Sequence, residues 1–421
     1  MATFLGRLLR RLGHAAEPLL APDAADRRAR EGAAGKRLAG MTAALTRVAD
    51  QVQRVTDRID KIDRRQAEHL QSAVSALEWT TRRQAAFAEK VLESSHHHRE
   101  HELARERALR RIQQLARRGG PILVGPWTGE VGFELLYWAP FVRWAVERFR
   151  IDPDRITLLS RGGTASWYGI EGAHYLDVLQ LCSPDEFRQR TLKDRKQRTL
   201  RLFDRQVIRQ ARRGMDPRAS VLHPAMMYAL YTPYWTQQTS SRWVRQFATP
   251  ARVRPPVIPG LQLPQDYVAL RFYFSKCFPE TPDNQALVGS IVQSLTRDTH
   301  VVLLGSGVSL DDHRDVRAER SDRVHTVDHL MRPETNLAVQ TAVIAGARAF
   351  IGTYGGFSYL APLCGVDTIA LYSRRNYYAH HLDFAQHVFK DVAGGSLTVM
   401  NAETFPLMRH VAAAAPRASN R

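Results

Sequence analysis

The strongest constraint on the fold is an alternation of apolar runs and helical segments that starts after residue 120. "PILVGPW" (121–127) has the composition of a buried strand, "TGEVGFELLYWAPFVRWAVERF" (128–149) that of a glycine turn followed by a helix, and "RITLLSRGG" (155–163) that of the next strand. Strand, helix and strand at this spacing predict a βαβ unit, whose two strands are parallel. The sequence therefore predicts an α/β fold with helices on both faces of a parallel sheet.

A second series of the same kind begins at "DYVALRFYF" (266–274) and ends at "DTIALYS" (367–373). Between these runs, "HVVLLGSG" (300–307) and "RAFIGTYGG" (348–356) have the composition of two further strands, each followed by a turn. The 421 residues leave room for two such domains and an extension, because a domain usually holds about 100–200 residues.

We therefore expect two Rossmann-like domains, over residues 119–265 and 266–421. The first contains a strongly basic segment, Arg188–Arg213, with eleven Lys and Arg residues against two Asp, which we expect to form one helix. It also contains an aromatic segment, Met226–Trp235, which suits either ligand contact or plain core.

Residues 41–118 are expected to form a helical coiled-coil region. From Leu45 the apolar residues alternate between spacings of three and four, which is the seam of a coiled coil. The residues of this seam are Leu45, Val48, Val52, Val55, Ile59 and Ile62. Self-association into a homo-oligomer follows from this pattern. The alternative is one long helix packed against the globular part.

Residues 1–40 combine a short basic amphipathic helix with a linker rich in Ala, Gly and Arg. Such a helix can rest on an anionic membrane surface or dock on its own protein. No run of about 18 apolar residues occurs, so we expect no transmembrane helix. We expect a cytoplasmic protein that can also lie peripherally at the inner face of the membrane. Its cysteines, which lack metal or redox spacing, are then free thiols: Cys182, Cys277 and Cys364.

The formal charge of +18 predicts an acidic partner, which could be a phosphorylated substrate, an anionic membrane surface or nucleic acid. Nucleic acid is disfavoured, because the arginines are not interleaved with exposed aromatic residues in a recognisable binding module.

The stretch "GTYGGFSYL", which begins at Gly352, predicts an anion site. In an open parallel sheet, ligands bind beyond the carboxyl ends of the strands, where unpaired backbone N–H groups and the helix dipole favour an anion. Arg271 ends the first strand of the same half, and Gly305 ends the next. The alternatives are a simple tight turn for the glycines and a structural ion pair for Arg271.

Together, the two Rossmann-like halves, the "GEVGFE" turn of the first and "ARAFIGTYGGFSYLAPLCGVDTIALYS" of the second resemble nucleotide-sugar glycosyltransferases of the GT-B fold, in the heptosyltransferase-like and fucosyltransferase-like branches. The resemblance covers residues 120–415. It implies a donor domain in the second half and an acceptor domain in the first, with no cofactor and no metal, the nucleotide-sugar being a co-substrate.

The resemblance also implies site residues. The donor diphosphate would be bound by Arg271, Thr353, Tyr354, Gly355, Gly356, Phe357 and Ser358. The nucleotide's base and ribose would lie against Gly305, Ser306, Gly307, Asp312 and His313.

Glycosyl transfer needs a base for the acceptor hydroxyl, and in the glycine turn Glu130 is our first choice for it, with Glu134 second. Either carboxylate could instead cap a helix N-terminus. His174, Asp312 and His313 are lesser candidates.

The function that follows is sugar transfer from a nucleotide-sugar to a glycan or lipid-linked acceptor, in the synthesis of a surface polysaccharide. Two alternatives stay open: a polysaccharide pyruvyltransferase-like enzyme, which uses a similar two-lobed fold, and a non-catalytic coiled-coil scaffold with a degenerate GT-B domain.

Overall fold

The computed structural model describes residues 97–192, 196–305, 310, 313–316, 321–374 and 379–404, together with helical residues scattered between 36 and 55 and between 71 and 83. The chain divides into two compact units, Met1–Leu103 and Ala104–Arg421. Helix α4 (His97–Arg117) begins in the first unit, and its residues from Ala104 onward belong to the second.

In the first unit, the described residues are helical, as the sequence predicts. Val48 and Val52 of the expected seam are half-buried, and Val55 is exposed. Leu45, Ile59 and Ile62 lie outside the described residues, as does the amphipathic segment before residue 36. Coiled-coil association therefore stays a prediction.

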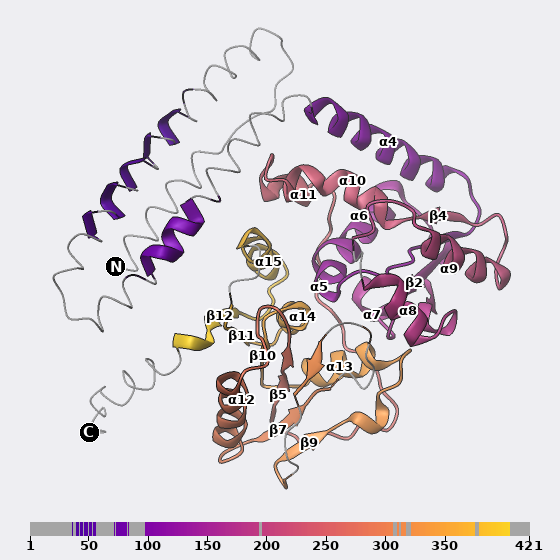
Figure 1. Ribbon diagram of the computed structural model, residues 1–421. Coiled ribbons are helices and arrows are strands. Elements are labelled where there is room, and N and C mark those ends of the chain that lie inside the picture. Colours follow the sequence, from indigo (N-terminus) through magenta and orange to yellow (C-terminus); the bar gives the residue numbers. More distant parts are fainter. Residues whose placement is uncertain are drawn as a thin grey trace. The chain divides into compact units, whose positions relative to one another are not determined.

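The second unit contains two parallel sheets (Figure 1). The first sheet has the order β3-β2-β1-β4. Its strands are β1 (Ile122–Val124), β2 (Ile156–Ser160), β3 (His174–Asp177) and β4 (Ser220–Leu222). Residues 131–149 form the crossover between β1 and β2, as α5 (Val131–Phe133), a π-helical turn (Glu134–Trp138) and α6 (Ala139–Phe149). We call the elements around this sheet the first lobe.

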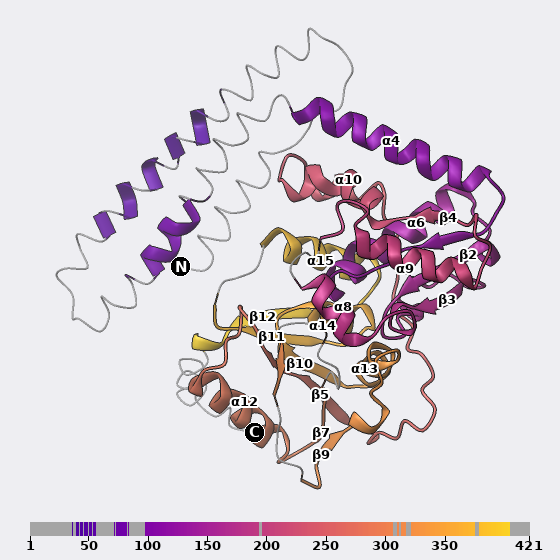
Figure 2. The ribbon, with the colours of Figure 1, turned by 45° about the vertical axis from the view of Figure 1, so that its right-hand side comes forward.

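The second sheet has the order β12-β11-β10-β5-β7-β9. Its strands are β5 (Tyr267–Arg271), β7 (His300–Leu303), β9 (Val324–Thr326), β10 (Ala349–Thr353), β11 (Thr368–Tyr372) and β12 (Leu397–Asn401). Its helices are α12 (Pro282–Leu295), α13 (Asn336–Ala345), α14 (Gly356–Leu363) and α15 (Ala379–Asp391). We call these elements the second lobe. Helices α12 and α13 lie on opposite sides of β5 and β7 in both views (Figure 1 and Figure 2).

Both strand orders match the Rossmann pattern, in which the chain builds outward in one direction and then returns to build in the other. In the second lobe the direction reverses between β5 and β10, which pair directly, with Arg271 opposite Gly352. The prediction of two parallel α/β sheets is therefore confirmed. Among the described residues, no helix combines the length and the apolar character needed to cross a membrane.

The prediction of one basic helix over Arg188–Arg213 is wrong. The structure has α8 (Pro184–Thr191) and α9 (Leu202–Arg213), and the described residues between them are irregular. The cause is Gln197, whose buried carboxamide accepts a hydrogen bond from the backbone N–H of Thr128 and donates to the carbonyl of Pro126. This anchoring holds the chain out of helical geometry, and α9 restarts where Asp204 accepts from the Arg201 N–H at 3.0 Å.

The aromatic segment forms α10 (Pro224–Trp235), with Tyr228 and Tyr231 buried in the main hydrophobic cluster. That cluster includes residues of both sheets, such as Leu158 of β2 and Phe350 of β10. The two lobes therefore share one core.

Candidate functional site

A cavity of about 710 Å³ lies between the lobes. Its walls come from segments that follow the carboxyl ends of strands in both sheets: residues 128–133 after β1, Arg161 after β2, residues 273–277 after β5, His313 beyond β7 and residues 354–357 after β10. Since ligands in open α/β sheets bind at this edge, the cavity is the candidate site.

Glycines from the two lobes meet at one wall of this cavity. A Cβ added at Gly356 would come within 2.8 Å of the backbone nitrogen of Gly132 and of the Val131 side chain. At Gly355, an added Cβ would overlap the Tyr273 hydroxyl. These glycines therefore let the start of α14 approach the start of α5, a packing role that the sequence does not reveal. Gly355 and Gly356 also line the cavity.

Three cationic side chains are among the described residues that line the cavity: Arg161, Lys196 and Lys276. Glu130 is the one Asp or Glu among the described lining residues, and its Oε1 lies 3.8 Å from Lys196 Nζ. Lys196 Nζ also lies 3.2 Å from the centre of the Phe133 ring. The excess of positive charge suits an anionic ligand.

Sequence reasoning missed all three cations. Arg161 directly follows β2, the same edge position that drew attention to Arg271, so the rule for parallel sheets could have found it. Lys196 and Lys276 lie in irregular segments, and no sequence signal marks them as cavity residues.

Glu130 is oriented differently from Glu134. Glu130 precedes α5 without a side-chain capping bond, and its side chain is 42% exposed. Glu134 is completely buried and is absent from the cavity lining. Its Oε1 accepts hydrogen bonds from Ser160 at 2.5 Å, from Tyr168 at 2.8 Å and from Thr164 at 3.2 Å.

Burial raises the pKa of Glu134, against the opposing effects of the Arg161 charge and the three hydroxyl donors. Arg161 Nη1 lies 3.8 Å from Glu134 Oε2, and neither atom has a hydrogen-bond partner among the described residues. Glu134 therefore contacts Arg161, which lines the cavity, but does not reach the cavity itself. Glu130 remains our candidate for the base.

Arg271 is held inside the second lobe. Its side chain is 4% exposed, and Nη1 donates to Asp315 Oδ1 at 2.5 Å and to the Leu304 carbonyl at 3.1 Å. Asp315 belongs to β8 (Arg314–Asp315), which pairs with β6 (Tyr273–Phe274). Arg271 is not among the cavity's lining residues. Arg271 thus forms a structural ion pair with Asp315, which is the alternative that the sequence left open.

The predicted diphosphate turn divides into two groups. Tyr354, Gly355, Gly356 and Phe357 line the cavity. Thr353 is buried and exchanges hydrogen bonds with the backbone of Tyr273. Ser358 is buried, donates to the Gly355 carbonyl at 2.6 Å and accepts from the Gly355 N–H. The hydroxyls of Thr353 and Ser358 are thus used within the fold.

The predicted base and ribose residues are also separated. His313 lines the cavity and stacks on Tyr273, with ring centres 4.4 Å apart. Gly305 does not line it, and Ser306, Gly307 and Asp312 lie outside the described residues. His174 begins β3 and is exposed, away from the cavity lining.

His381 of α15 is a cavity residue that sequence reasoning did not select. Its Nδ1 lies 2.6 Å from the Tyr137 hydroxyl of the first lobe. Burial lowers the pKa of His381 to about 3, and the nearby His380 and Lys196 add to this effect. The imidazole is therefore neutral near pH 7.

No cluster of His, Cys, Asp or Glu in the described part of the chain could hold a metal ion. Cys182, Cys277 and Cys364 are free thiols, as predicted. Burial raises the pKa of Cys182 and of Cys364 to about 12. Neither thiol is thus prepared as a nucleophile at neutral pH.

Comparison with known proteins gave matches among solved structures alone. No family model matches the chain, and no curated protein matches it. The similar structures include the E. coli ADP-heptose LPS heptosyltransferase II, at 12% identity over 66% of this chain and 90% of that one, with a TM-score of 0.34. E. coli heptosyltransferase WaaC with ADP is 13% identical over 69% of this chain and 99% of that one, with a TM-score of 0.37.

A glycosyl transferase family 9 protein from Veillonella parvula is 12% identical over 70% of this chain and 89% of that one, also with a TM-score of 0.37. These proteins are of the class that the sequence resemblance predicts. Identities and TM-scores this low carry no argument about the activity of this chain, which has to be argued from its own cavity.

Proposed function

We propose that the protein is a glycosyltransferase that binds a nucleotide-sugar in the interlobe cavity. The observation that carries this proposal is a cavity at the carboxyl edges of two Rossmann-ordered sheets, lined by three cations and one partly exposed carboxylate. A volume of about 710 Å³ lies within the range of about 300–1,000 Å³ that small-molecule sites occupy.

In the proposed reaction, the acceptor oxygen bonds to the anomeric carbon while the bond from that carbon to the diphosphate breaks. Lys196, Lys276 and Arg161 stabilise the negative charge that develops on the leaving diphosphate, since cations aimed at developing charge lower the barrier. Gly355 and Gly356 also line the cavity. Glu130 takes the proton of the acceptor hydroxyl.

The finer assignments belong to this proposal as well. The first lobe holds the acceptor, a glycan or lipid-linked sugar, and the second holds the donor nucleotide. The pathway is surface polysaccharide synthesis at the inner face of the membrane. The proposal also includes self-association through the coiled coil. It further includes contact of the N-terminal helix with the membrane.

The test is a thermal-shift screen with uridine, guanosine and adenosine diphosphates, each beside its monophosphate, and with phosphoenolpyruvate. A ligand that binds only the folded state, at about 100 times its Kd, adds about 2.7 kcal/mol of stability. We expect one nucleoside diphosphate to raise the melting temperature by a few degrees, and Lys196→Gln with Lys276→Gln to remove most of that shift.

The control is Lys390→Gln, because Lys390 is exposed at the end of α15 and absent from the cavity lining. It should leave the shift unchanged. A response to phosphoenolpyruvate alone would replace the proposal with pyruvyl transfer, and no response to any ligand would leave the scaffold as the better description.

A further inference from the structure

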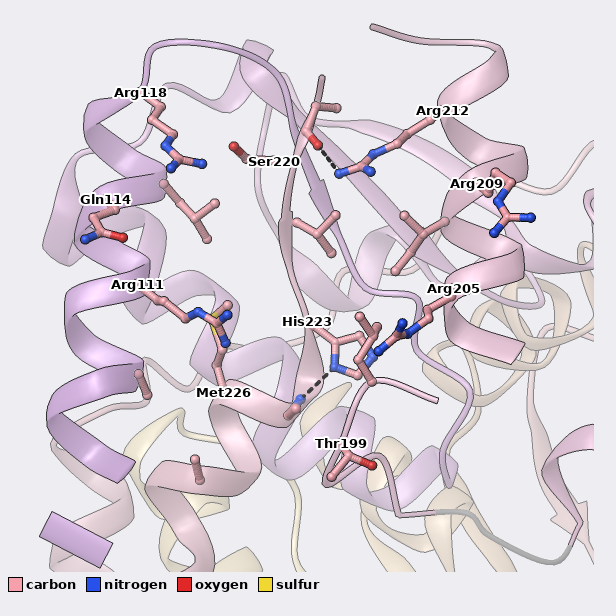
Figure 3. Close-up of a pocket in the computed structure, with 18 of the residues that line it drawn as sticks. Arg111, Gln114, Arg118, Thr199, Arg205, Arg209, Arg212, Ser220, His223 and Met226 are labelled. Carbon is pink, nitrogen blue, oxygen red and sulfur yellow. Dashed lines mark hydrogen bonds between the residues drawn. The ribbon is translucent and has the colours of Figure 1, made fainter. Parts of the chain in front are cut away.

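A second and larger cavity lies in the first lobe, along the edge strand of its sheet. This groove, of about 1390 Å³, runs beside β4, which pairs only with β1 in the first sheet. Figure 3 shows its two walls: Arg111 of α4 and Arg118, just after that helix, lie on one side, and Arg205, Arg209 and Arg212 project from α9 on the other. We call this cavity the arginine groove.

The arginine groove is lined by nine arginines and by no Asp or Glu among the described residues. The arginines are Arg107, Arg111, Arg118, Arg198, Arg205, Arg209, Arg212, Arg213 and Arg218. Of these, Arg218 forms an ion pair with a described carboxylate, that of Asp216 at 3.3 Å. Like charges facing one groove create a strong positive potential, so the favourable occupant is an anion.

The arrangement of these charges indicates a chain with repeated negative groups. Arg111 lies on α4, and Arg118 follows the last residue of that helix. Arg205 and Arg212 are seven residues apart on α9, which separates them by about 10 Å along the helix. A single headgroup would occupy only part of this length. A polyanion reaches cations along both walls and releases several counterions at once.

The side chains between the arginines distinguish between polyanions. They are mostly aliphatic, with Ala108, Leu115, Ile208 and Val221 among them, and the buried His223 has the one aromatic ring among the described lining residues. Binding of single-stranded nucleic acid usually depends on aromatic rings on which the bases stack. Aliphatic side chains instead contact the C–H faces of sugar rings, while guanidinium groups bind phosphate or carboxylate bidentately.

We propose that the arginine groove is a second ligand site, which binds a polyanionic glycan with phosphate or carboxylate groups repeated along its length. The inference goes beyond the proposed function, because it concerns a different cavity and holds whether or not the interlobe cavity transfers sugars. One segment of the chain lines both cavities: Lys196 lines the interlobe cavity, and Arg198, Thr199 and Leu200 line the groove.

The experiment measures fluorescence anisotropy of labelled glycans with the full chain, without any nucleotide, across salt concentrations. The probes are oligogalacturonate for carboxylate, phosphomannan for phosphate, and a maltooligosaccharide of matched length as the neutral glycan. We expect at least one anionic glycan to bind, with an affinity that falls as salt rises, and the neutral glycan not to bind.

The variant Arg111→Gln/Arg205→Gln/Arg209→Gln removes three exposed charges from both walls. We expect it to weaken glycan binding by roughly tenfold or more. The matched control, Arg148→Gln/Arg297→Gln/Arg332→Gln, removes three exposed charges outside the groove and should change binding by less than about twofold.

Equal losses in the two variants would overturn the proposal, because binding would then follow net charge and not the groove. Two further probes test the ligand class: a single-stranded oligonucleotide and phosphatidylglycerol vesicles. Tighter binding of either probe than of both anionic glycans at the same salt would replace the glycan with that ligand. Absence of binding to both anionic glycans would also overturn the proposal.

Discussion

At the scale of single residues, the cavity separates carboxylates by their surroundings. Glu130 keeps a partly exposed carboxylate near Lys196, whereas the carboxylate of Glu134 is enclosed by three hydroxyl donors. We therefore expect the two carboxylates, which lie four positions apart, to have different roles. Proton transfer needs a group that the acceptor can reach, and a buried, hydrogen-bonded carboxylate instead stabilises the fold.

Substitutions at the two positions should therefore act on different quantities. Glu130→Gln should lower the turnover of nucleotide-sugar by about 10²–10⁴-fold, with little change in melting temperature because the side chain makes no capping bond. Glu134→Ala should cost about 3–5 kcal/mol in the free energy of unfolding, since Arg161 loses its buried partner. Donor turnover and urea unfolding measure the two effects. Full turnover in Glu130→Gln would remove this residue from the mechanism.

His381 makes the stability of the fold depend on pH, and its lowered pKa sets the sign of this dependence. Its folded-state pKa of about 3 lies below the ordinary value of 6.5, so the unfolded chain binds more protons between these two pH values. This residue's contribution to stability is fully present above pH 6.5 and is lost as the pH falls toward 3. The slope reaches about 1.4 kcal/mol per pH unit within the window.

Urea unfolding from pH 4.5 to pH 7 checks this expectation. We expect on the order of one proton to be taken up on unfolding in this pH range. His381→Gln should flatten the stability profile relative to the unchanged chain. His387→Gln, which removes a histidine at an exposed position on the same helix, outside the cavity lining, is the matched control. Parallel profiles for the unchanged chain and His381→Gln would contradict the assignment.

At the scale of elements, the contact between the starts of α5 and α14 depends on the absence of side chains. Gly132 and Gly356 bring two helix starts together at the cavity wall, in a space where a methyl group would meet backbone atoms. Backbone cannot move aside as a flexible side chain can, so the packing is sensitive to one carbon atom.

Gly356→Ala should therefore destabilise the chain by about 1–3 kcal/mol, the usual cost of overpacking. Gly289→Ala is the matched control, because Gly289 is an exposed residue of α12 with no atom within 4 Å of an added Cβ. It should stabilise by about 0.4–1 kcal/mol. Chemical denaturation of both variants gives the comparison, and an equal response would show that the lobes can separate to accept the methyl group.

The sequence predicts elements better than it predicts their contacts. The strands are visible because parallel strands are buried on both faces and appear as apolar runs, as in "HVVLLGSG". The partner of Arg271 is not visible, because Asp315 lies 44 positions away on a two-residue strand. The interruption at Gln197 also depends on a distant segment, the backbone after β1. Sequence alone thus located the carboxyl edge and some lining residues, such as Glu130, Tyr354 and His313, but not the cations that line the cavity.

At the scale of the whole second unit, the two lobes are connected by hydrogen bonds as well as by a shared hydrophobic core. Trp167 Nε1 donates to Thr341 Oγ1 at 2.9 Å, and the Ala338 N–H donates to the Gly162 carbonyl at 2.8 Å. A common core and buried cross-links favour cooperative unfolding. We therefore expect the two sheets to unfold together.

Hydrogen exchange under increasing denaturant should show β2 and β10 losing protection at the same concentration. Trp167→Phe, which removes the bond to Thr341, should lower both transitions together by about 1–3 kcal/mol. If one sheet lost protection well before the other, the lobes would be independent folding units.

Residues 196–201 form a segment that lines both cavities. Its first residue reaches the interlobe cavity, its middle borders the arginine groove, and Gln197 fastens it to the backbone after β1. A ligand in either cavity that shifts this segment would also change the lining of the other cavity. Each ligand would then change the binding affinity of the other by the same factor. Occupancy of the groove would in that way regulate donor binding in the interlobe cavity.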